Sequence, residues 1–329
     1  MTDWNLRQPD RRDGDAYVAS ADLKLAVDVA LATGRPLLVR GEPGSGKSSL
    51  APYVARTRGW RYYEHVVTSR TQATDLLWTF DSVRRLADAQ TLPPGGRLDD
   101  FRYVGPGVLW WAFAPVSAAR RGRLVRGRAG HGRQPMLGQH SAADPFSHTN
   151  RQRSPDHAVV LIDEIDKADP DMPNSLLVPL GSSEFLVTET GTLVRKEPPS
   201  PGTDATASRH LVVVTTNEER ALPQAFLRRC VIFALPEPTR DWLIAVARDH
   251  VLTSGGEFAG RVEKLAEELA DELIKTRKAP DRQAARPPST AEYLDALRAC
   301  IGLEVSVDSQ EWLLIRKLTL AKQDAGTVP

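Results

Sequence analysis

Cysteine is scarce in this sequence, with Cys230 and Cys300 as the two examples among 329 residues. So few thiols exclude a disulfide scaffold and a cysteine-rich zinc site, and they are typical of a reducing compartment. Long apolar runs are also missing, since no stretch approaches the roughly 18 residues of a membrane-spanning helix. The opening segment MTDWNLRQPDRRDGD has no apolar signal core. These absences predict a cytoplasmic protein without membrane insertion.

Neither sign of charge is in excess, because 43 basic and 42 acidic side chains leave a formal net charge of +1. This balance removes any global electrostatic argument for binding nucleic acid or an acidic membrane surface. The composition is 41% hydrophobic and 26% charged, which is typical of a globular protein. A chain of this length can bury a large core, so we expect one large domain and a smaller one.

Short apolar runs rich in β-branched residues alternate with helical patterns up to Pro238, and beyond it the strand signals disappear. This alternation predicts an α/β fold with a largely parallel sheet that is buried on both faces. We expect an α/β core over residues 1–236 and a helical domain over residues 237–329. The runs expected to form strands span residues 36–40, 62–67, 158–162, 211–216 and 231–235.

Capping signals place the starts of two helices. Ser20 is suited to cap a helix that ends before Gly34. Ser289 and Glu292 form the pattern of a capping box at the start of a second helix, in the C-terminal domain.

Two segments interrupt the expected core. Residues 120–157 are rich in Arg, Gly, Ser and His with little periodicity, which predicts a long mobile loop. Its six arginines between residues 120 and 133 have no interleaved aromatics, so a solvated loop is favoured over nucleic-acid contact. Residues 184–195 alternate on both sides of Thr190 and Gly191, which predicts a β-hairpin.

The strongest motif is GEPGSGKS, which follows an apolar run and precedes a helical pattern. It fits G-x-x-x-x-G-K-[ST], in which a glycine-rich turn directs backbone N–H groups at phosphates. Lys47 is expected to reach the β- and γ-phosphates, and Ser48 to hold Mg²⁺. The spacing does not fit the dinucleotide pattern G-x-G-x-x-G; the remaining alternative is a turn without a ligand. The expected phosphate-binding residues are Gly41, Glu42, Pro43, Gly44, Ser45, Gly46, Lys47, Ser48 and Ser49.

Pro52 falls in the second turn of a helix that would begin at Lys47. Proline lacks an N–H group, so we expect a kink at this position.

Acidic and amide residues follow two further apolar runs. Asp163 and Glu164 end the run at 158–162, where ligands bind in parallel sheets. We expect Asp163 to complete the Mg²⁺ shell with Ser48, and Glu164 to polarise the attacking water. Asn217 follows the run at 211–216 and could orient that water. The alternative is a set of solvated side chains at strand ends.

This order of motifs resembles the AAA+ ATPases, and the flanking segments resemble their MoxR-like branch. The resembling segments include GPGVLWWAF, LIDEIDKADPDMPNSLL and LPQAFLRRC. The resemblance implies the sheet order 5-1-4-3-2, a helix-2 insert at about residues 76–102, and a hairpin before the strand of Asn217. It gives Asn217 the sensor-1 role.

The resemblance also assigns the arginines. Arg229 falls on the finger that contacts the γ-phosphate held by a neighbouring subunit, while Arg228 stands where many relatives have Asp. A surface pair that caps the preceding helix is the alternative. Thr290 occupies the place of the usual sensor-2 arginine; Arg286 is a weak substitute and Arg298 lies deeper in the helix.

An ATP-hydrolysing ring, by resemblance a hexamer, that remodels a protein partner is therefore the leading functional hypothesis. The resemblance suggests a von Willebrand factor A-domain protein as that partner. A nucleotide-gated scaffold with slow hydrolysis is the alternative, because the sensor-2 arginine is missing. A P-loop kinase leaves the hairpin unexplained, and the loop alone does not exclude GTP.

Overall fold

The computed structural model describes residues 14–123, 141–198, 200, 210–278, 287–307 and 309–320. The chain divides into two compact units. Unit 1 contains Met1–Lys24, Arg40–Arg56 and Ala234–Pro329; unit 2 contains Leu25–Val39 and Thr57–Phe233. The expected boundary at residue 236/237 stays a prediction.

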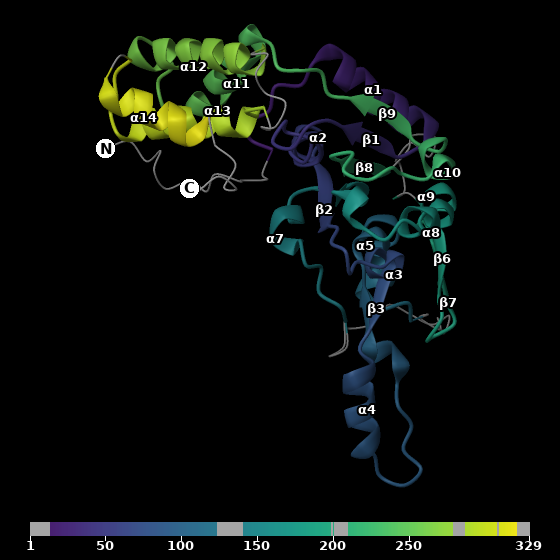
Figure 1. Cartoon of the computed structure of the whole chain (residues 1–329). Helices are drawn as coiled ribbons and strands as arrows, with labels where there is room; N and C mark the ends of the chain where they lie inside the picture. The colour runs from purple at the N-terminus through teal and green to yellow at the C-terminus, as the bar shows by residue number, and fades with distance from the viewer. Residues whose placement is uncertain are drawn as a thin grey trace, which may run out of the picture. The chain divides into compact units, whose positions relative to one another are not determined.

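The largest sheet of the described residues has five strands (Figure 1). Its strands in spatial order are β2, β5, β8, β1 and β9. When the strands outside this sheet are left out of the numbering, the order is 5-1-4-3-2 read from β9, and this prediction is confirmed. The bounds are β1 Leu37–Arg40, β2 Trp60–Val66, β5 Ser154–Asp163, β8 His210–Thr216 and β9 Val231–Ala234.

The middle of the sheet is buried on both faces. β5 pairs in parallel with β2, with Tyr63 opposite Val160, and with β8 on its other side. Successive side chains of a strand point to opposite faces, and both Val160 and its neighbour Leu161 are fully buried. Helix α5 (Val108–Phe113) packs against β2 and β5. This double cover explains why these strands have continuous apolar sequences.

Two expectations about the strands were wrong in part. The run at 231–235 is not fully buried: β9 is an edge strand with alternating exposure, and Ile232 is 43% exposed. The irregular loop expected over residues 120–157 ends earlier, because β5 begins at Ser154 and helix α7 covers Ser147–Asn150. The side chain of Asn150 accepts from the N–H of Tyr62 and donates to its carbonyl, so it pairs with an edge strand. Residues 124–140 of this loop lie outside the described residues.

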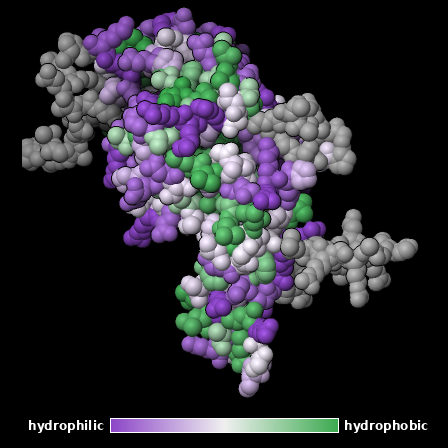
Figure 2. Space-filling model, turned by 90° about the vertical axis from the view of Figure 1, so that its right-hand side faces the viewer, coloured by the Kyte–Doolittle hydropathy of each residue, from purple (hydrophilic) through white to green (hydrophobic). Residues whose placement is uncertain are grey.

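Unit 2 carries an arm that projects from the side of the sheet (Figure 1). An antiparallel pair forms its base, with Trp78 opposite Pro106. α4 lies at its far end and has no buried residue. Val83 and Leu86 on α4 are exposed, and hydrophobic surface is visible on the arm in Figure 2. The arm comprises β3 Trp78–Phe80, α4 Ser82–Gln90, η2 Asp100–Tyr103 and β4 Val104–Pro106.

The hairpin predicted over residues 184–195 is present, as β6 (Glu184–Val187) and β7 (Thr192–Arg195) in antiparallel register. Ser20 accepts from the N–H of Leu23 at the start of α1, as expected. The other helices are α1 Ala21–Thr33, α3 Ala73–Leu77, α6 Pro115–Ala119, η3 Ile165–Lys167, α8 Met172–Ser175, α9 Leu177–Ser182 and α10 Gln224–Leu227.

Four C-terminal helices in unit 1 enclose a second core. Leu243, Leu269, Leu297 and Trp312, one from each helix, are buried in it. The capping box of Ser289 and Glu292 at the start of α13 is confirmed. No helix in the described part of the chain is long and apolar enough to cross a membrane. These helices are α11 Arg240–Thr253, α12 Arg261–Lys278, α13 Thr290–Gly302 and α14 Gln310–Thr319.

His250 in α11 makes the stability of the four C-terminal helices sensitive to acid. Burial and the nearby charge of Arg298 lower the pKa of His250 from 6.5 to about 4, against a smaller opposing effect of Asp249. The unfolded chain therefore binds more protons between these values, so stability present above pH 6.5 is lost as the pH falls toward 4. This acid-dependent loss in the free energy of unfolding is at most about 3 kcal/mol. We expect His250→Asn to abolish it, as measured by chemical denaturation at several pH values. His148→Asn, at an exposed histidine in α7, is the control; an unchanged acid dependence in His250→Asn would contradict the prediction.

Candidate functional site

The glycine-rich loop in unit 1 starts directly after β1 and leads into α2 (Leu50–Thr57). Within it, Lys47 is 5% exposed, and its ammonium donates to the carbonyls of Gly41 and Glu42, each at 2.7 Å. Ser45 also donates its hydroxyl to the carbonyl of Glu42, at 2.7 Å. The lysine is thus held against the loop itself, through two of its backbone carbonyls.

Two glycines of the loop have backbone conformations that side chains rarely adopt. Gly44 has φ +75° and Gly46 has φ +88°. Both values lie in the left-handed region that favours glycine. A Cβ atom on Gly44 would also lie 2.5 Å from Oγ of Ser289. The path of the loop therefore favours glycine at both positions.

The expected helix start at Lys47 was wrong. Lys47 to Ser49 form a turn, and α2 begins at Leu50. Pro52 therefore lies in the first helical turn, where backbone N–H groups have no partner inside the helix. Proline removes no helical hydrogen bond there, so the reason for expecting a kink disappears.

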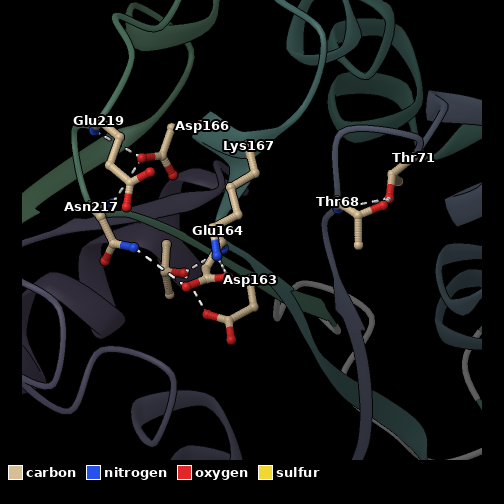
Figure 3. A network of polar contacts seen from close by, with 9 residues as sticks. Thr68, Thr71, Asp163, Glu164, Asp166, Lys167, Asn217 and Glu219 are labelled. Atoms are coloured by element: carbon tan, nitrogen blue, oxygen red, sulfur yellow. Dashed lines mark hydrogen bonds and ion pairs between the residues drawn. The ribbon is translucent and has the colours of Figure 1, made fainter. Parts of the chain in front are cut away.

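An acidic cluster forms where β5 and β8 end in unit 2 (Figure 3). Asp163, the last residue of β5, is 1% exposed and accepts from the hydroxyl of Thr215 at 2.6 Å. The same hydroxyl oxygen accepts from the backbone N–H of Glu164 at 2.9 Å. Thr215 was not predicted as a site residue, although the polar TT at the end of LVVVTT is a signal for it. One buried hydroxyl thus fixes both neighbouring acidic residues.

Glu164 is held between a cation and an amide. Its backbone is left-handed, with φ 61° and ψ 49°. One carboxylate oxygen pairs with the ammonium of Lys167 at 2.6 Å, and the other accepts from the amide of Asn217 at 3.4 Å (Figure 3). The hydrogen bond to Glu164 raises the pKa of Lys167, so this lysine stays charged at neutral pH. The Glu164 carboxylate is therefore oriented, and partly neutralised, by its own chain.

Asp166 holds the segment that follows β8. It is 3% exposed, and its Oδ2 accepts from the backbone N–H groups of Asn217 and Glu219, at 3.2 and 3.0 Å. Its Oδ1 is buried without a hydrogen-bond partner in the described part of the chain. Asp166 therefore positions Asn217 beside Glu164, a role that sequence spacing did not reveal.

A cavity of about 340 Å³ opens beside this cluster. Glu164 and Lys167 line it on one side, and Thr68 and Ser69 line it on another. Of the three residues that the sequence predicted to act together, Glu164 lines this cavity. Asn217 contacts Glu164, and Asp163 is joined to the same cluster through Thr215.

Arg228 and Arg229 follow α10 directly and are both exposed. The carbonyl of Arg228 accepts from the guanidinium of Arg35 at 3.0 Å. No carboxylate of the described residues pairs with either guanidinium of the Arg228–Arg229 pair. Two charges are thus presented to solvent before the edge strand β9. Arg286, the weak sensor-2 candidate, lies outside the described residues.

Comparison with known proteins gives a family match. The family described as "AAA domain (dynein-related subfamily)" matches residues 36–230, which is more than half of the chain. No curated protein matches the sequence.

Solved structures similar to this chain include a proline-to-glycine variant of RuvB from Thermotoga maritima. It has a TM-score of 0.48 and 13% identity, covering 97% of this chain and 76% of that chain. A candidate ATPase from Cytophaga hutchinsonii has a TM-score of 0.41 and 13% identity, covering 94% and 83% respectively.

Proposed function

Because the chain belongs to the AAA domain family, in its dynein-related subfamily, we propose that it binds ATP with Mg²⁺ and hydrolyses it to ADP and phosphate. The observation that carries this proposal is the acidic cluster, in which Thr215 fixes Asp163 and Glu164 at the end of β5. The glycine-rich loop supports it, because the same chain offers a buried lysine and glycines with left-handed backbones.

The loop would bind the phosphates. Its N–H groups and the N-terminal end of α2 attract negative charge, and Lys47 supplies a full positive charge. The ammonium already has two carbonyl partners, on Gly41 and Glu42, so its burial is compensated. A phosphate oxygen would accept from the ammonium in place of these carbonyls, or together with them, through a stronger, charge-assisted bond.

Ser48 and Asp163 would hold Mg²⁺. A hydroxyl and a carboxylate are hard oxygen donors, which suit this ion, and the remaining ligands of such sites are water and phosphate oxygens. Thr215 fixes the Asp163 carboxylate through a 2.6 Å hydrogen bond, and this limits its reorientation. Bound Mg²⁺ supplies charge neutralisation for the phosphates.

Glu164 would act as the general base toward the attacking water, and Asn217 would orient that water. Both side chains already meet, at 3.4 Å, and Glu164 lines the cavity. The ammonium of Lys167 pairs with one oxygen of the Glu164 carboxylate at 2.6 Å. Full activity therefore requires that Glu164 turns away from Lys167.

Arg229 would complete the site of a neighbouring subunit, which implies a ring, by resemblance to the MoxR-like branch a hexamer. Its exposure without a carboxylate partner in the described residues supports this role. Arg228 would lie at the same interface. The work of the ring would be to remodel or assemble a partner protein, by the same resemblance one with a von Willebrand factor A domain.

A nucleotide-gated scaffold with slow hydrolysis is the second candidate. The observation that favours it is the 2.6 Å ion pair between Lys167 and Glu164, which engages the proposed base. In this alternative ATP binding drives assembly, and hydrolysis only resets it.

Equilibrium binding of a fluorescent ATP analogue with Mg²⁺ tests the proposed function. We expect saturable binding by the wild type and an affinity loss of about 10- to 100-fold in Lys47→Ala, the range for a charged hydrogen-bonded group. Lys24→Ala, at an exposed lysine in α1, is the matched control. Equal affinities for wild type and Lys47→Ala would refute the assignment of the loop.

A further inference from the structure

The C-terminal helices contact the glycine-rich loop at two points, both inside unit 1. The backbone N–H of Ala291 donates to the carbonyl of Gly44 at 3.1 Å. Ala291 is the second residue of α13, so its N–H has no acceptor within the helix. The guanidinium of Arg277, near the end of α12, pairs with the Glu42 carboxylate at 2.9 Å.

Arg277 joins three segments at once. Its side chain is 8% exposed, and Nη1 also donates to the carbonyl of Pro288 at 3.0 Å. A guanidinium so well covered is costly to bury unless its donors find partners. Here the partners lie on the loop and on the residue that precedes the N-cap of α13. Arg277 therefore links α12, the start of α13 and the second residue of the glycine-rich motif.

The two contacts use the groups of the loop that phosphate does not need. Ala291 binds a carbonyl, and Arg277 binds the side chain of Glu42, so neither occupies a loop N–H group. The close approach depends on Gly44, because a Cβ atom there would lie 2.5 Å from Oγ of Ser289 and 2.8 Å from its Cβ. The helices thus contact the loop through groups other than its N–H groups.

We propose that Arg277 is a positioning residue for nucleotide binding. With Glu42 it holds the loop in its phosphate-binding conformation, so that nucleotide affinity depends on the docking of α12 and α13 on the loop. In the reverse direction, a nucleotide that moves the loop shifts these helices through the same contacts. This inference rests on the proposed function and names a route of regulation for the same site.

A double-mutant cycle between Arg277 and Glu42 tests the proposal. We expect Arg277→Met to weaken binding of fluorescent ADP, and to raise KM for ATP, by about threefold to tenfold, with kcat changed by less than about twofold. Glu42→Gln should give a similar loss. The double variant should lose no more than either single variant, because the two changes remove one interaction. Arg277→Lys, which keeps the charge, should recover most of the affinity.

Arg240→Met is the matched control, since it breaks a 2.8 Å ion pair with Asp271 between α11 and α12 away from the loop. It should leave ADP affinity and KM unchanged. Thermal unfolding of each variant shows whether a loss of affinity reflects unfolding, and Glu42→Gln, which breaks the same ion pair, serves if Arg277→Met does not fold. The inference is overturned if Arg277→Met binds ADP as tightly as Arg240→Met does. It is also overturned if the affinity losses of the two single variants add up in the double variant. Absence of nucleotide binding by the wild type would instead refute the proposed function, and the inference with it.

Discussion

Replacing Glu164 with Gln is expected to reduce steady-state ATP hydrolysis by about 10²- to 10⁴-fold, the usual contribution of a general base. The amide cannot accept a proton from water, yet it keeps the shape of the side chain and its contact with Asn217. ATP binding should be retained, because Glu164 lies in the acidic cluster and makes no contact that holds Lys47. Multiple-turnover phosphate release, measured beside equilibrium binding of ATP, separates the two effects.

Glu219→Gln is the matched control, since Glu219 lines the same cavity and its hydrogen bond to Asp166 is made by the backbone N–H, which the change keeps. It should keep hydrolysis within about twofold, the range of a surface change. A wild type that already hydrolyses as slowly as Glu164→Gln, but assembles with ATP, would favour the scaffold over the motor. Loss of ATP binding in Glu164→Gln would contradict the assigned role.

The parts of the fold that follow from local chemistry could be predicted from the sequence. Continuous apolar runs identify the strands, although the run at 231–235 forms a partly exposed edge strand. Capping residues such as Ser20 and Ser289 mark helix starts, because both signals lie within a few residues of the feature. The glycine-rich motif belongs to the same class, since its backbone conformation needs glycine at Gly44 and Gly46. The sheet order came from the resemblance to the AAA+ family.

The contacts that organise the cluster could not be predicted, because they join residues that are distant in sequence. Thr215 fixes Asp163 across 52 positions, and Asp166 holds the N–H of Asn217 across 51. A hydroxyl or a carboxylate at a strand end looks solvated until the register of the two strands is known. The kink expected at Pro52 failed for a different reason. The effect of a proline depends on where the helix begins, and the start of α2 can shift by a turn without changing the apolar pattern.

Replacing Arg229 with Ala is expected to reduce hydrolysis by about 10³- to 10⁵-fold, the contribution of an arginine that stabilises phosphoryl transfer from outside the nucleotide's own subunit. The side chain is exposed and has no carboxylate partner in the described residues, so its removal should cost little stability. ATP affinity should change much less than the rate. Arg228→Ala should reduce hydrolysis less; the reverse order would mean that the finger is Arg228.

Mixing two inactive variants tests whether Arg229 acts on a neighbour. Lys47→Ala subunits keep the arginine but lack the phosphate lysine, whereas Arg229→Ala subunits keep an intact glycine-rich loop. If the finger acts between subunits, some interfaces of a mixed assembly combine an intact glycine-rich loop on one subunit with Arg229 on the other. Hydrolysis should then reappear, with a maximum near equal proportions. If it acts within its own subunit, no proportion restores activity, although size measurements show co-assembly. The dependence of hydrolysis on the mixing ratio therefore tests whether the phosphate that Arg229 contacts belongs to a neighbouring chain.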